Sequence, residues 1–129
     1  MRMDRFTVKS QEALQNAQEL AKDGEHPEVS PEHLLMALLT QEGAPTPAIV
    51  TNVGADFARV KEAAQEALDK KATVQGLAAD LYFSISTRRI LDGAWKEAQE
   101  LEDAYMSTEH LLIATARDKD SAAGKLLRK

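Results

Sequence analysis

The three histidines are the side chains of this chain best suited to chemistry. His33 and His110 each follow a glutamate, and such a pair could supply a general base or a metal ligand. The two pairs lie far apart in sequence, and only His26 remains to complete a site. An adjacent Glu-His pair also lacks the spacing by which a helix presents two histidines to zinc. The sequence therefore favours structural roles for His33 and His110, in the first turns of two helices.

Other residue patterns argue against catalysis and cofactor binding. The chain has no cysteine, which excludes disulfides, zinc-thiolate sites and cysteine nucleophiles. Gly124-Lys125 has neither the upstream glycine nor the following hydroxyl of a phosphate-binding loop. No Ser/His/Asp spacing and no motif glycine indicates a hydrolase. We therefore predict a chain that is not an enzyme and has no catalytic residue, metal or cofactor.

The composition is that of a soluble globular protein, with 43% hydrophobic and 29% charged residues. A net charge of -5, from 21 acidic and 16 basic side chains, repels phosphate backbones, so nucleic acid is not expected as a partner. The N-terminus lacks the apolar run of a signal peptide, and no stretch approaches the roughly 20 apolar residues that cross a bilayer. We expect a cytoplasmic protein that does not bind membranes.

The sequence contains an internal repeat. A shift of 77 positions aligns residues 6–50 with residues 83–127 without a gap, and 11 of these 45 positions are identical. Chance would give roughly three identities. The strongest match aligns Ser-Pro-Glu-His-Leu-Leu, from Ser30, with Ser-Thr-Glu-His-Leu-Leu, from Ser107. The chain is therefore expected to consist of two copies of one structural unit.

Each copy has the periodicity of helices. Apolar residues recur at spacings of three and four in both copies, and neither copy shows the alternation of a strand. Hydroxyl side chains that can cap a helix precede the first helix of each copy, at Thr7 and Ser84, and the second helix, at Ser30 and Ser107. These four residues are predicted N-caps.

The first copy continues with a short helix around residues 47–53, which ends at Gly54, and a fourth helix over about 56–70. We therefore predict an all-α fold in which two pseudo-symmetric tandem repeats of a four-helix motif form one globular domain. The predicted bounds are about 4–70 for repeat one, about 71–82 for the linker and about 83–129 for repeat two. The counterpart of the fourth helix would lie beyond residue 129, so we expect the last helix of repeat two to be truncated.

Three segments carry a resemblance to a known family. They are the opening Met1-Arg-Met-Asp-Arg-Phe-Thr-Val-Lys-Ser-Gln-Glu-Ala-Leu, the Ala17-Gln-Glu-Leu-Ala that follows, and the twin Glu-His-Leu-Leu helix starts. On these segments the chain resembles the Clp amino-terminal domain, built of Clp repeats, over essentially its whole length. Its Asp-Arg-Phe-Thr opening is more similar to the ClpB disaggregase chaperones than to ClpA or ClpC.

This resemblance implies a domain that binds exposed hydrophobic segments of unfolded or aggregated client proteins. The parent protein would be an ATP-dependent disaggregase, a homohexamer whose ATPase modules, with their ATP and magnesium, lie outside this chain. The resemblance also implies that the isolated domain is a monomer and that the parent works with a DnaK-type chaperone system. An alternative is an adaptor-docking domain of the ClpA or ClpC kind, which binds a folded adaptor protein instead of clients.

The resemblance also implies which residues handle clients. A threonine at the start of the first helix and two acids near the loop before the sixth helix are matched here by Thr7, Asp103 and Glu109. It further implies an apolar groove at the seam between the repeats. The candidates for this groove, which flank the two related helix starts, are Phe6, Val8, Tyr82, Ile85 and Leu91. Apart from the resemblance, Thr7 could be only an N-cap, Glu109 only an acid favoured at a helix start, and Asp103 only a solvated loop acid.

Overall fold

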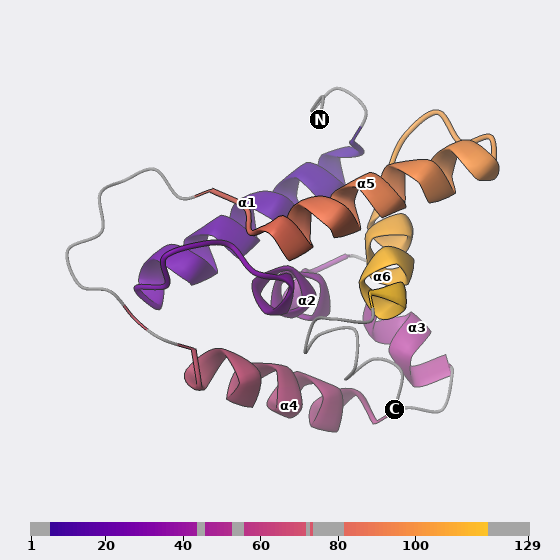
Figure 1. The fold of residues 1–129 in the computed structure, drawn as a ribbon. Coiled ribbons are helices and arrows are strands. Elements are labelled where there is room, and N and C mark those ends of the chain that lie inside the picture. The colour runs from indigo at the N-terminus through magenta and orange to yellow at the C-terminus, as the bar shows by residue number, and fades with distance from the viewer. Residues whose placement is uncertain (1–5, 44–45, 53–55, 72, 74–81, 119–129) are drawn as a thin grey trace.

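The computed structural model describes residues 6–43, 46–52, 56–71, 73 and 82–118 (Figure 1). Within these residues the chain forms six helices and no strand. They are α1 (Val8–Asp23), α2 (Pro31–Thr40), α3 (Thr46–Asn52), α4 (Phe57–Asp69), α5 (Ile85–Glu100) and α6 (Thr108–Arg117). The prediction of an all-α fold is confirmed.

The helix bounds follow the sequence repeat. Helices α5 and α6 begin and end 77 residues after α1 and α2, with lengths of 16 and 10 residues in both copies. The Oγ1 of Thr7 accepts a hydrogen bond from the Ser10 amide at 3.1 Å, and the Oγ of Ser84 accepts one from the Thr87 amide at 3.1 Å. Both side chains therefore cap the first helix of their copy. The stop predicted at Gly54, most of the predicted linker, and residues 119–129 lie outside the described residues.

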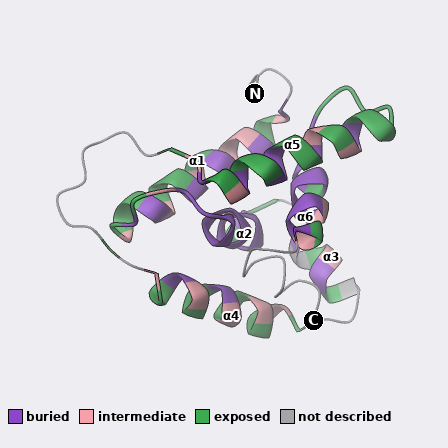
Figure 2. Ribbon diagram, in the orientation of Figure 1, coloured by how far each residue is buried: buried purple, intermediate pink, exposed green. Residues whose placement is uncertain are grey.

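Helix α2 is the centre of the fold. Nine of its ten residues are buried, and it contacts α1, α3, α4, α5 and α6. A helix with apolar residues on most of its sides requires other helices to cover it. Figures 1 and 2 show α2 nearly end-on and buried along its length, with α1 and α5 on one side and α4 on the other. Its largest fully buried side chains are Leu34, Leu35, Leu38 and Leu39.

Two isolated backbone bridges join the copies across the seam. Phe6 pairs with Met106, and Val29 pairs with Phe83, both in parallel orientation. The second pair is the image of the first, because Phe83 lies 77 residues after Phe6 and Met106 lies 77 residues after Val29. We call these two pairs the reciprocal bridges.

Each bridge is strengthened by a side-chain hydroxyl. The Met106 carbonyl accepts hydrogen bonds from the Thr7 amide at 3.0 Å and from the Ser10 Oγ at 2.9 Å. In the other bridge, the Val29 carbonyl accepts the Ser84 amide at 3.0 Å and the Thr87 Oγ1 at 2.9 Å. All four donors belong to the opposite copy from the carbonyl they reach, so each copy completes the hydrogen bonding of the other.

The hydroxyls of the reciprocal bridges should contribute equally to stability. Thr87→Val removes a buried donor without changing the side-chain volume, and Ser10→Ala removes its counterpart. We expect each variant to lose about 1 kcal/mol of unfolding free energy, the usual net value of one buried hydrogen bond. Urea denaturation followed by circular dichroism measures this loss. If either variant were as stable as the unmodified chain, that hydroxyl would not support its bridge.

Candidate functional site

Five large apolar side chains remain more than half exposed among the residues that the structure describes. Val8 (78%) and Ile85 (81%) are repeat equivalents and are the first residues of α1 and α5. Tyr82 is 60% exposed, while Leu101 and Tyr105, in the loop after α5, are each 57% exposed. Where exposed apolar side chains lie together, they mark surfaces that bind another polypeptide.

Two of the five predicted groove residues are buried in the structure. Phe6 and Leu91 are only 4% and 5% exposed and belong to the main hydrophobic core. They offer almost no surface to a ligand, because Phe6 is held by the bridge to Met106 and Leu91 packs on the inward face of α5. Val8, Tyr82 and Ile85 are exposed, as a surface groove requires.

Sequence reasoning missed Leu101 and Tyr105. Their repeat equivalents are Gly24 and Glu28, so a loop that is polar in the first copy has gained two large apolar groups in the second. Comparison of the aligned copies, residue by residue, would have revealed this change. The sequence therefore does indicate these two residues, but only at positions where the aligned copies differ.

A pocket of about 420 Å³ opens beside these two residues, between the end of α5 and the start of α6. We call it the α5–α6 pocket. Its lining residues are Leu101, Asp103, Ala104, Tyr105, Ser107, Glu109, His110 and Ile113. Two of the three residues predicted to handle clients, Asp103 and Glu109, therefore lie in one pocket together with exposed apolar side chains.

Hydrogen bonds hold Asp103 in place. The Nδ1 of His110 accepts the Ser107 amide at 2.9 Å, so the ring proton lies on Nε2. That nitrogen lies 3.0 Å from the Oδ2 of Asp103 and donates to it. Half of the Asp103 side chain remains exposed, so the carboxylate is oriented at the pocket and still accessible.

Glu109 is oriented in a similar way. Its Oε2 accepts from the Ser107 Oγ and its Oε1 from the Thr108 Oγ1, both at 3.2 Å. It lies in the first turn of α6, where the helix dipole favours a negative charge. The residue is nonetheless exposed.

Thr7 lies next to the pocket without lining it. Its amide donates to the Met106 carbonyl at 3.0 Å, and Met106 lies between two lining residues, Tyr105 and Ser107. The reciprocal bridge thus brings Thr7 into the same region as Asp103 and Glu109, although about 100 residues separate them in the sequence.

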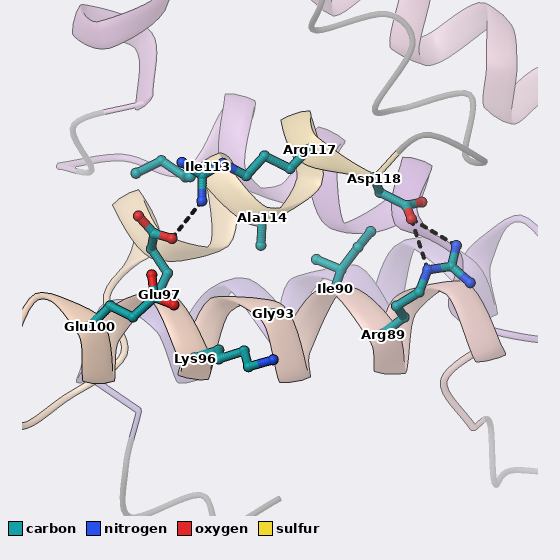
Figure 3. Close-up of a pocket in the computed structure, with 10 residues that line it drawn as sticks. All are labelled: Arg89, Ile90, Gly93, Lys96, Glu97, Glu100, Ile113, Ala114, Arg117 and Asp118. Atoms are coloured by element: carbon teal, nitrogen blue, oxygen red, sulfur yellow. Dashed lines mark hydrogen bonds and ion pairs between the residues drawn. The ribbon is translucent and has the colours of Figure 1, made fainter.

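Two more pockets lie on the described part of the chain. Figure 3 shows one of about 300 Å³, along α5 and α6, with the ion pairs Arg89–Asp118 (2.7 Å) and Arg117–Glu97 (2.6 Å) at its ends and Ala114 between them. Its lining carries three cations and three carboxylates, so no net charge attracts a ligand to it.

The other pocket, of about 370 Å³, lies between α1 and α4. None of the three pockets is lined by a groove candidate, and the groove at the seam stays a prediction.

The histidines complete capping boxes at the starts of α2 and α6. The Nδ1 of His33 accepts a hydrogen bond from the Ser30 amide at 2.9 Å, and the Nδ1 of His110 accepts one from the Ser107 amide at the same distance. In both capping boxes histidine therefore occupies the position where Glu or Gln is usual. The Nε2 of His33 lies 2.7 Å from the Nδ1 of His26.

The described residues contain no cluster of three groups able to hold a metal, and none of their helices is long and apolar enough to span a membrane.

His33 should make the stability of the chain depend on pH. Burial, followed by His26 and the Lys71 ammonium, lowers the pKa of His33 from 6.5 to about 4. The unfolded chain therefore takes up a proton more readily, so the contribution of neutral His33 is complete above pH 6.5 and is lost as the pH falls toward 4. We expect a loss of about 1 kcal/mol of unfolding free energy between pH 7.5 and pH 5.5 from this residue.

Urea denaturation at the two pH values, with His33→Gln as the reference, measures this loss. Glutamine also fits the capping box but does not titrate. The variant should lose less stability on acidification than the unmodified chain, and an equal loss in both would exclude His33 as the cause.

The comparisons with known proteins agree with the fold. The family model described as the Clp repeat (R) N-terminal domain matches residues 5–129. Chaperone protein ClpB of Vibrio cholerae serotype O1 is 37% identical over 128 residues, which cover 99% of this chain. The chain spans 15% of the length of that relative.

Two solved structures share the fold. The Hsp104 N-terminal domain from Candida albicans has a TM-score of 0.84 at 22% identity, covering 95% of this chain and 79% of that chain. A ClpV N-domain, solved as a complex with a VipB peptide, has a TM-score of 0.75 at 23% identity, covering 96% of this chain and 77% of that chain.

Proposed function

The chain belongs to the Clp repeat N-terminal domain family, and on that premise we propose that it binds clients for a ClpB-type, ATP-dependent protein disaggregase. Its ligands are the exposed hydrophobic segments of unfolded or aggregated proteins. The domain performs no chemistry itself, since the ATPase modules with their ATP and magnesium belong to other parts of the parent, a homohexamer of the cytoplasm that works with a DnaK-type chaperone system.

The observation that carries this proposal is the exposure of Val8, Tyr82, Ile85, Leu101 and Tyr105. Apolar groups that stay in water are a source of binding free energy for any ligand that covers them. Exposed apolar surface is also what distinguishes an aggregated protein from a native one, so the domain and its clients match in chemistry. The ClpV N-domain solved with a VipB peptide supports a peptide as the ligand of this fold.

Weak binding suits this function. A small surface that orders a flexible segment should bind in the micromolar to millimolar range, roughly, because the ordering offsets much of the burial. Six copies in a hexamer would raise the effective affinity, while each single contact still releases its client quickly. A client must leave this domain before the ATPase modules can act on it.

The second candidate function is docking of a folded adaptor, as in the ClpA and ClpC branches. In the ClpV complex one defined partner, a VipB peptide, occupies the N-domain. This observation favours the alternative. The two functions differ in what they recognise, because an adaptor presents one folded surface whereas clients share only their exposed apolar segments.

Titration with a permanently unfolded protein, followed by amide shifts of the isolated domain, tests the proposal. We expect weak saturable binding, and we expect the double substitution of Val8→Ser with Ile85→Ser to weaken it about tenfold, since each variant removes a highly exposed apolar group without changing the core. Gln18→Ser, at an exposed polar position of α1, is the control and should leave the affinity unchanged. No response at millimolar concentration, or equal binding to native proteins, would contradict client capture.

A further inference from the structure

The two repeats share one hydrophobic core. Leu34 of α2 and Leu111 of α6, which are repeat equivalents, are both fully buried and belong to the same cluster of core residues. Across the seam, α2 packs against α5 and α6, and α1 packs against α6. Burial of apolar surface is the main source of folding free energy, so the apolar side chains that each repeat turns to the seam need the other repeat to cover them.

The hydrogen bonds of the seam join residues that are remote in the sequence. The Thr7 amide donates to the Met106 carbonyl at 3.0 Å. In the other bridge Val29 forms two hydrogen bonds, because its carbonyl accepts the Ser84 amide and its amide donates to the Tyr82 carbonyl, both at 3.0 Å. None of these bonds requires that the two repeats belong to the same polypeptide. A repeat two from a second chain would present the same donors and acceptors at the same places.

Each repeat also has local contacts of its own. Helix α1 packs against α2 in repeat one, and α5 packs against α6 in repeat two. The caps are local as well, since Thr7 accepts from the Ser10 amide and Ser84 accepts from the Thr87 amide. The helices of a repeat and the surface that it turns to the seam are therefore the same whichever chain supplies the other repeat.

We propose that the seam is also an interface between two copies of this chain, in which repeat one of each chain pairs with repeat two of the other. Both globular units of this exchanged dimer keep the reciprocal bridges and the shared core. The seam is buried, so the exchange takes place while the chains fold or after the seam has opened. The fraction of dimer then rises with the concentration of the chain. This inference does not depend on the proposed function.

Two full-length variants with equivalent defects test the proposal. Leu34→Asp places a carboxylate in the core of repeat one, and Leu111→Asp places one at the equivalent position of repeat two. We expect neither variant to fold alone, because a buried charge without a partner is strongly destabilising. The two variants are then unfolded in urea, mixed at millimolar concentration and refolded. In the mixture, the intact repeat one of the Leu111→Asp chain can pair with the intact repeat two of the Leu34→Asp chain.

We expect the mixture to regain helical circular dichroism and a cooperative urea transition, and to elute as a dimer in size-exclusion chromatography. The midpoint of this transition should rise with chain concentration, as it does for any folded state that needs two chains. The unmodified chain, refolded at millimolar concentration, should likewise contain a dimer that refolding at micromolar concentration does not produce. A mixture that stays as unfolded as its separate components would overturn the proposal.

Ser10→Ala supplies a matched control, because the same substitution can be added to either variant. In the Leu111→Asp chain, Ser10 belongs to the repeat that pairs, and its hydroxyl donates to the Met106 carbonyl of the other chain in the exchanged dimer. There we expect Ser10→Ala to weaken the association about fivefold, the effect of one buried hydrogen bond. In the Leu34→Asp chain repeat one is the defective repeat, so Ser10→Ala should leave the association unchanged. Equal effects in the two chains would mean that the dimer forms through another surface, and the proposal would be wrong.

Discussion

Two backbone carbonyls, those of Val29 and Met106, hold the two copies together, and each accepts two hydrogen bonds from the opposite copy. This pairing fixes the starts of α1 and α5, since the donors are the N-caps and the residues three positions later. The pairing also affects which side chains are exposed. Because the bridge to Met106 holds Phe6 in the core, Val8, two residues later, faces solvent. The apolar surface proposed for clients is thus a consequence of how the copies close on one another.

Within the described residues the two copies share helix bounds but differ in the partners of equivalent side chains. In the first, Lys71 and α4 enclose the start of α2, and His33 is buried against His26. In the second, the equivalent histidine donates to a half-exposed aspartate at an open pocket. Among the described residues, the equivalent histidines of the two copies therefore have different partners.

Local chemistry made much of the fold predictable from the sequence. The helix starts follow from hydroxyl caps such as Thr7 and Ser84, and the aligned copies give the second set of bounds from the first. Exposure was less predictable, because it depends on segments remote in sequence: Glu32 is buried and pairs with Lys71, which follows another helix, α4. The burial of Leu91 was not predictable for the same reason, since periodicity identifies an apolar face but not whether another helix covers it.

The reciprocal bridges also bear on the origin of the chain. Each bridge is the image of the other, which is the relation between subunits in an isologous dimer. A single ancestral copy could therefore have formed the same seam by pairing with itself, at a stability that depended on its concentration. Fusion into one polypeptide replaces that dependence with an effective concentration on the order of millimolar, independent of expression level. It also frees each half to accumulate substitutions that a symmetric pair would have to accept twice.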